Sequence, residues 1–184
     1  TAEAVLRHRL REAGLGEQVA VASAGTHNYH PGKAADERSA AHAQRRGIDL
    51  SGHRARQITD ADFEQMDLIL VMDWDNLALT QAACPAPHQH KVRRLMEFAR
   101  QHPDTVVPDP YHGGASGFGH VLDLLEDAFL AGAFFAARFF AAGLAAEIAL
   151  RAASALAKGI TVSSLLSSEP QGGRLMVLEM DMST

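Results

Sequence analysis

Hydrophobic positions at the start of the chain follow a helical and then a strand-like pattern. Apolar side chains recur every three or four residues over residues 2–13, most charged residues lie outside this stripe, and Gly14 and Gly16 end the segment. The run "QVAVASAG" that follows is short, rich in valine and alanine, and ends at Gly25. The pattern predicts a helix, a strand and then a loop over "HNYHPGK".

The same alternation continues through the middle of the chain. The predicted elements are, in order, a helix in "AADERSAAHAQRRG", a helix capped by Thr59 in "ITDADFEQM", a buried strand in "DLILVM", a helix from about residue 76 to 83, a weaker strand in "HKVRRLM" and a helix in "GFGHVLDLLEDAF". Strands that alternate with helices at this spacing indicate a parallel sheet. Ligands of such sheets bind beyond the carboxyl ends of the strands, so we expect the functional loops there.

The composition changes beyond residue 128. Residues 128–159 contain fourteen alanines and five of the eight phenylalanines, so helix propensity alone predicts a helix. Residues 128–146 carry Arg138 as their only charge and are nearly long enough to span a bilayer, but an arginine at the centre of a span is costly. A soluble helix is therefore favoured over a membrane span. The runs "ITVSSLL" and "RLMVLEM" then resemble two apolar strands.

Charge and cysteine content restrict the class of protein. The net charge of -5 argues against generic nucleic-acid binding. The single cysteine, Cys84, excludes an intramolecular disulfide and a cysteine-rich metal site, and it suits a reducing cytoplasm. His88 and His90 have no third ligand at usable spacing, so we expect neither a metal nor another cofactor.

The stretch "PDPYHGG" is the strongest candidate for chemistry. Asp109 lies between Pro108 and Pro110, and the residue before a proline is pushed into an extended conformation, so a stiff loop presents the carboxylate. A rigid acid beside Tyr111 is typical of a group that protonates a leaving group. The alternative is a carboxylate that caps a local turn, which aspartate before proline often does.

Five segments together resemble the low-molecular-weight protein tyrosine phosphatase family. They occur in the order of the family's helix, substrate-wall loop, two supporting elements and general-acid loop: "TAEAVLRHRL", "SAGTHNYHPGKAADER", "GHRARQI", "DLILVMDWDNL" and "PDPYHGGASGF". The resemblance implies a three-layer α/β domain with a short parallel sheet over residues 1–128, followed by an Ala-rich helical extension of unknown role over residues 129–184. It also implies hydrolysis of phosphotyrosine in proteins through a cysteinyl-phosphate intermediate.

The resemblance assigns roles to individual residues. Asp109 corresponds to the general acid, and Tyr29 and Tyr111 correspond to aromatic walls that favour a phosphotyrosine ring, although either could be an ordinary core or surface tyrosine. Four further residues match positions that support the phosphate loop, or are simply solvated or capping residues: His53, Asp36, Asp73 and Asn76.

The family's nucleophile has no counterpart in the sequence. In that family, a first strand and a C-x5-R-S/T loop precede the helix that corresponds to "TAEA". The loop supplies the thiolate and the arginine that holds the phosphoryl oxygens. The chain opens with Thr1 just after that point, so we expect an N-terminal piece to be absent and this chain to be inactive. Cys84 does not replace the loop, because the residue six positions after it is His90, whereas the C-x5-R pattern requires an arginine there. We expect "RLMVLEM" or "ITVSSLL" to fill the vacant central strand position, which pairing with "DLILVM" would test.

Two other functions remain open, and a third is disfavoured by the cysteine content. A non-catalytic binding or regulatory remnant would use the crevice to recognise phosphorylated partners. An arsenate reductase on the same scaffold needs additional cysteines to relay a disulfide, which this sequence lacks. Hydrolysis of phosphoarginine is not excluded, although Tyr111 favours phosphotyrosine. The sequence does not predict an oligomeric state.

Overall fold

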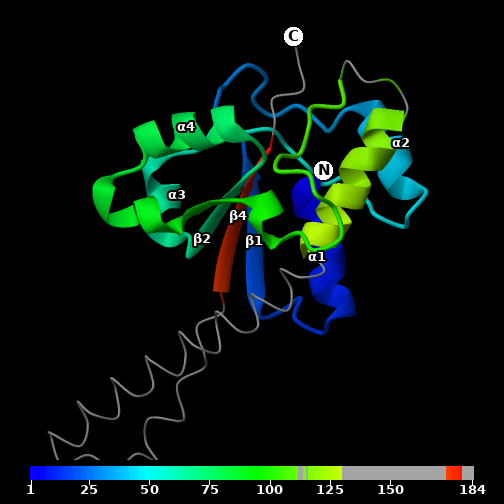
Figure 1. Ribbon diagram of the computed structural model, residues 1–184, viewed down its shortest axis with the longest axis horizontal. Coiled ribbons are helices and arrows are strands. Elements are labelled where there is room, and N and C mark those ends of the chain that lie inside the picture. Colours follow the sequence, from blue (N-terminus) through cyan, green and yellow to red (C-terminus); the bar gives the residue numbers. More distant parts are fainter. Residues whose placement is uncertain (112–113, 115, 130–172, 180–184) are drawn as a thin grey trace, which may run out of the picture.

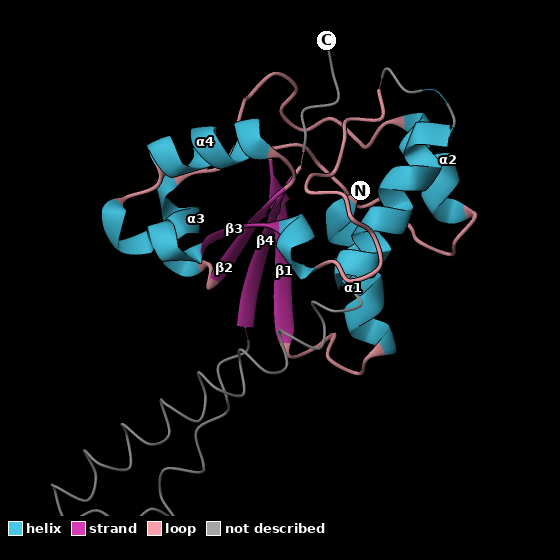
Figure 2. Ribbon diagram, in the orientation of Figure 1, coloured by secondary structure: helices cyan, strands magenta, loops and turns pink. Residues whose placement is uncertain are grey.

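The structure of the protein, a computed structural model, describes residues 1–111, 114, 116–129 and 173–179 (Figure 1). Its centre is a four-stranded, all-parallel sheet (Figure 2). The strands lie in the order β1 (Val19–Ala24), β4 (Gly173–Leu178), β2 (Leu68–Val71) and β3 (Val92–Arg94).

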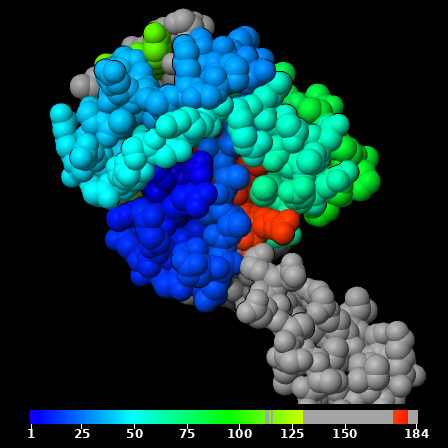
Figure 3. Space-filling view, turned by 180° about the vertical axis from the view of Figure 1, so that it is seen from behind, coloured from blue at the N-terminus to red at the C-terminus, as the bar shows by residue number. Residues whose placement is uncertain are grey.

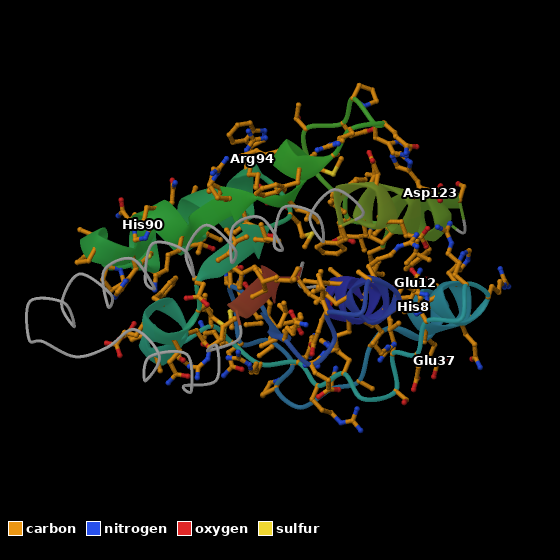
Figure 4. All side chains as sticks on the ribbon, turned by 90° about the horizontal axis from the view of Figure 1, so that it is seen from below. His8, Glu12, Glu37, His90, Arg94 and Asp123 are labelled. Carbon is orange, nitrogen blue, oxygen red and sulfur yellow. The ribbon has the colours of Figure 1, made fainter. Side chains whose placement is uncertain are left out.

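Helices cover both faces of this sheet. One face packs against α1 (Ala2–Glu12) and a helix over residues 116–129, with α2 (Glu37–Gln44) beside them; the other packs against α3 (Asp60–Gln65) and α4 (Trp74–Ala83). Seen from below, His90 and Asp123 lie on either side of the red-brown β4 (Figure 4). The prediction of a three-layer α/β fold is confirmed.

The pleat of β4 shows how the layers form. Leu175 and Val177 join the cluster that contains the apolar stripe of α1, whereas Met176 and Leu178 join the cluster that contains Phe63 of α3. Successive side chains of a strand point to opposite faces, so a continuous apolar run serves two cores at once.

Local signals set the helix boundaries. Gly14 follows α1 with φ of +72°, a left-handed conformation that glycine adopts without steric cost. Thr59 precedes α3 as predicted. The N–H and the hydroxyl of Thr59 donate hydrogen bonds to the Asp62 carboxylate at 2.8 and 2.9 Å. The helix expected from about Asn76 begins earlier, at Trp74, because Asp73 caps it. The weak strand is β3, and short 3-10 helices flank it: η1 (Ala86–Lys91) and η2 (Leu95–Phe98).

The central strand β4 comes from the end of the chain. It pairs with β1 from Val19↔Gly173 to Ala24↔Leu178 and with β2 from Leu68↔Leu175 to Val71↔Leu178. The hypothesis that "RLMVLEM" or "ITVSSLL" takes a central strand position beside "DLILVM" is therefore confirmed for "RLMVLEM". The run "ITVSSLL" and most of the alanine-rich segment lie outside the described residues. Within the described residues, no helix is long and apolar enough to cross a membrane.

Candidate active site

A cleft of about 330 Å³ opens at the carboxyl ends of β1 and β4. This is the rim at which the sequence predicts ligand binding. Seen from behind, the red residues of β4 lie between the blue first third of the chain and its teal middle (Figure 3). The lining comes from the end of β1, the loop after it, the following segment, and three more distant residues: Ala24, Gly25, His27, Asn28, residues 30, 31 and 33–36, His53, Ala55, Arg56, Tyr111, Glu179 and Thr1.

Backbone hydrogen bonds fix the loop that forms the wall of this cleft. Gly25 donates to the Arg56 carbonyl at 2.8 Å, and Gly32 donates to the Ala55 carbonyl at 2.7 Å. Ala55 donates in return to Lys33 at 2.9 Å. Gly32 has φ of +77°, a conformation that side chains rarely adopt, so glycine is needed at this turn. The loop is therefore tied along its length to residues 55–58.

The two tyrosines lie at different depths. Tyr111 lines the cleft, and its role as an aromatic wall for the substrate stays a prediction. Tyr29 is 60% exposed and is not among the lining residues that the structure describes, but its ring stacks on His27 at 4.9 Å between centroids, and His27 does line the cleft. Tyr29 therefore stands at the rim, behind His27, and its role as a wall stays a prediction.

Asp109 lies on the surface beside this rim. Its Oδ1 accepts a hydrogen bond from the Tyr111 N–H at 2.8 Å, which is the local turn that the sequence left open as an alternative. The loop is anchored just before Asp109, where the Val107 N–H donates to the carbonyl of Met72, directly after β2, at 2.9 Å. The role of Asp109 as an acid stays a prediction. The turn gives its carboxylate a defined position next to Tyr111.

Arg38 joins the wall loop to the loop of Asp109. Its guanidinium lies over the rings of Tyr111 and Phe118, at 4.8 and 4.9 Å from their centroids, and forms an ion pair with Asp36 at 3.0 Å. It also donates to the Tyr111 carbonyl at 3.4 Å. Sequence reasoning missed this residue, because its two aromatic partners, Tyr111 and Phe118, lie more than seventy positions away.

Asp36 and His53, two of the four predicted supporting residues, line the cleft. Asp36 caps α2 by accepting from the N–H groups of Arg38 and Ser39, and the Arg38 side chain holds the pKa of the Asp36 carboxyl below its usual value. The Nδ1 atom of His53 is buried and has no hydrogen-bond partner among the described residues.

The other two supporting residues pair with each other at the end of β2. Asp73 Oδ1 accepts from the Asn76 N–H at 2.6 Å, so Asp73 is a helix cap. Asn76 is buried, and within the described part of the chain its Oδ1 atom has no partner. Neither residue is among the described residues that line the cleft. Support of a phosphate loop by any of the four stays a prediction.

Glu179 is the residue that the sequence did not predict at this site. It follows β4, and its carboxylate accepts from the Thr1 amino group at 2.6 Å and from the Glu3 N–H at 3.2 Å. Burial alone would raise the pKa of the Glu179 carboxyl, but the Thr1 amino group and His53 outweigh burial and hold that pKa below its usual value. One signal in the sequence could have identified Glu179. It is a glutamate directly after an apolar strand run, and the carboxyl ends of parallel strands lie at the rim where ligands bind.

Cys84 lies elsewhere in the fold. It is buried on the α4 side of the sheet, in the cluster of Phe63, and burial raises the pKa of its thiol. A thiol that is buried and mostly protonated is a poor nucleophile. Within the described residues, no group of three or more His, Cys, Asp or Glu side chains could hold a metal ion.

Comparison with known proteins identifies the family of this chain. The family described as low molecular weight phosphotyrosine protein phosphatase matches residues 1–138. A low molecular weight protein-tyrosine-phosphatase of Streptomyces coelicolor is 39% identical over 130 residues, which cover 69% of this chain and 79% of the relative.

Solved structures give the same result. A protein tyrosine phosphatase from Entamoeba histolytica, with Hepes in its active site, superposes with a TM-score of 0.69 at 36% identity, covering 71% of this chain and 83% of that one. The YwlE arginine phosphatase, with a phosphorylated active-site serine, gives a TM-score of 0.64 at 25% identity, covering 72% and 83%. This chain therefore belongs to the low molecular weight phosphotyrosine protein phosphatase family.

Proposed function

We propose that the cleft is the substrate site of a phosphatase that hydrolyses phosphotyrosine in other proteins in the cytoplasm. The observation that carries this proposal is the position of Tyr111 in the wall of a cleft at the carboxyl ends of β1 and β4, in a chain of this family. An aromatic ring beside the cleft favours a substrate whose phosphate is attached to another ring.

Asp109 is the proposed general acid. Its exposed carboxylate is held by the Tyr111 N–H, so it lies on the same loop as the ring that would contact the substrate. Cleavage of a phosphate monoester expels an oxyanion, and a positioned acid that protonates it accelerates the step by roughly two to four orders of magnitude.

We further propose that these 184 residues do not turn over substrate by themselves. The only cysteine is buried away from the cleft, and the residue six positions after it is His90. Within the described residues no cysteine lines the cleft, and Arg56, which does line it, is paired with Asp62 at 2.8 and 2.9 Å. The charge that develops on the phosphoryl oxygens therefore lacks the thiolate and the unpaired arginine that the reaction needs.

The test compares hydrolysis of p-nitrophenyl phosphate by two proteins. One is the chain as it stands; the other is extended upstream with a C-x5-R-S loop and its strand, and lacks residues 173–184 because β4 fills the position that the added strand needs. We expect turnover only in the extended protein. Asp109→Asn should slow that turnover by about 100-fold or more, whereas Asp104→Asn, a carboxylate outside the cleft lining, should leave it nearly unchanged.

The outcomes separate the other candidate functions. Binding of a phosphotyrosine peptide by the unextended chain without turnover would favour a non-catalytic binding module. Faster hydrolysis of a phosphoarginine peptide than of a phosphotyrosine peptide would favour the activity named for the YwlE relative. Turnover by the unextended chain would contradict the proposed inactivity, and Cys84→Ser would then be the next variant.

A further inference from the structure

The two segments that build the wall of the cleft are rich in basic residues. Residues 26–35 form the wall loop, residues 52–58 tie it in place, and together they contain one lysine, two arginines, three histidines and no acidic residue. The acids at their borders already have donors, because Asp36 pairs with Arg38 at 3.0 Å and Asp49 accepts from Ser51 at 2.8 and 2.9 Å. The wall therefore carries more positive charge than its neighbours neutralise.

Lys33 lines the cleft and has no carboxylate beside it. Its side chain is exposed, and its amino group has neither a hydrogen bond nor an ion pair among the described residues. Its backbone is nonetheless fixed, because the Lys33 N–H donates to the His30 carbonyl at 3.2 Å and the Lys33 carbonyl accepts from the Ala55 N–H at 2.9 Å. The rim thus presents an unpaired ammonium group from a defined point of the backbone.

The other charged side chains that line the cleft are already paired. Arg56 donates two hydrogen bonds to Asp62 at 2.8 and 2.9 Å, and Asp36 holds Arg38. The Glu179 carboxylate accepts from backbone and has only 18% of its side chain exposed, so it faces a ligand less than the exposed Lys33 does. Among the lining residues that the structure describes, Lys33 therefore offers the charge that a ligand can reach most easily.

Two histidines of the wall loop add hydrogen-bond donors beside Lys33. His27 and His30 both line the cleft. The His27 ring stacks on Tyr29 with 8° between the ring planes, and its Nδ1 lies 3.1 Å from the Thr26 hydroxyl, which leaves Nε2 for a ligand. An imidazole N–H donates to a carboxylate oxygen, so both rings suit the same kind of partner as the lysine.

We propose that the wall loop selects phosphotyrosine peptides with acidic residues beside the phosphotyrosine, and that Lys33 recognises their carboxylates. This inference rests on the proposed function, because that function places the phosphotyrosine of another protein in this cleft. The whole chain carries a net charge of -5 and repels acidic peptides in general. A preference for such peptides therefore requires a local cation at the site where they bind.

The experiment measures binding of two phosphotyrosine peptides to the full chain by fluorescence anisotropy at pH 7. One peptide has glutamates beside the phosphotyrosine and the other has lysines. At about 0.1 M salt, where charges act over about 10 Å, the Kd of the glutamate peptide should be at least about threefold lower than that of the lysine peptide. At about 1 M salt, where charges act over about 3 Å, this difference should disappear.

A charge reversal assigns the preference to Lys33. Lys33→Glu should bind the lysine peptide more tightly than the glutamate peptide, and Lys33→Gln should bind the two about equally. Arg45→Glu is the matched control, because it changes the net charge by the same amount at an exposed position about 13 Å further along α2 than Asp36. It should keep the preference of the unsubstituted chain. Equal Kd values of the two peptides for the unsubstituted chain, binding of neither peptide, or the same change in Arg45→Glu as in Lys33→Glu would overturn the inference.

The proposed function and this inference fail separately. The hydrolysis test uses p-nitrophenyl phosphate, which has no flanking residues, and a protein without residues 173–184. Turnover of that substrate together with equal Kd values for the two peptides would remove the inference alone. A preference for the glutamate peptide that depends on Lys33, without turnover in the extended protein, would remove the proposed reaction and leave the peptide preference in place.

Discussion

At the scale of single residues, Asp127 illustrates how a buried charge is satisfied. Its carboxylate accepts from the N–H groups of Arg100, Gln101 and His102 at 2.9 to 3.3 Å, and the residue is 8% exposed. Burial alone would raise the pKa of this carboxyl, but the three N–H groups outweigh burial and lower it.

A pH dependence follows from this lowered pKa. Because the pKa of Asp127 is lower in the folded than in the unfolded chain, its stabilisation is present above about pH 4 and is lost as the pH falls through the folded pKa. Asp127→Asn should lower the free energy of unfolding by about 2 kcal/mol at pH 7, and this difference should shrink at lower pH. Urea unfolding at pH 7 and pH 3 measures both, with the exposed Glu17→Gln as control. A difference that stays constant between the two pH values would contradict the prediction.

The sequence identified only some of the residues at the site. The resemblance named Tyr111 as an aromatic wall and Asp36 and His53 as supporting residues; all three lie among the cleft-lining residues, and their roles stay predictions. Glu179 and Arg38 were not expected, because their roles come from contacts with residues far away along the chain. Local patterns carry no information on such contacts.

At the scale of elements, Arg38 connects α2 to the loop of Asp109. The guanidinium lies over two rings and pairs with Asp36, so its loss should loosen that loop without removing a core residue. We expect Arg38→Ala to increase the rate of chymotrypsin cleavage after Tyr111 several-fold. Arg45→Ala, at the exposed end of the same helix, should not change that rate. Equal rates in the two variants would show that Arg38 does not hold the loop.

Periodicity predicted the α-helices and strands but neither 3-10 helix, and η1 and η2 replace the two ends of the strand expected in "HKVRRLM". The boundaries of the elements depended on single side chains. The stripe in α1 and the apolar run of β2 are strong local patterns. The choice between "RLMVLEM" and "ITVSSLL" for the central strand could not be made from sequence, because both runs are apolar enough for a buried strand. Pairing with β1 and β2 decides it, and pairing is a tertiary interaction.

At the scale of the whole molecule, β4 holds the sheet together. Within the described sheet, β1 and β2 each pair with β4 and not with each other. Removal of residues 173–184 should therefore abolish cooperative unfolding, since both cores lose their central apolar side chains. Circular dichroism and urea titration measure this effect, and removal of residues 180–184 alone is the control. A shortened chain that unfolds with the same midpoint would contradict the prediction, and would show that residues 1–172 fold without the strand.

The central place of β4 has a consequence for protein synthesis. The ribosome releases β1 and β2 long before it makes Gly173, so the growing chain has two strands with open edges and no strand between them. Strand edges of this kind readily pair with other chains. Long-range pairing is also slow to form, because the loop between the strands must first be closed. The fold is therefore completed only after translation has passed β4, and until then the nascent chain depends on low concentration or chaperones to avoid aggregation.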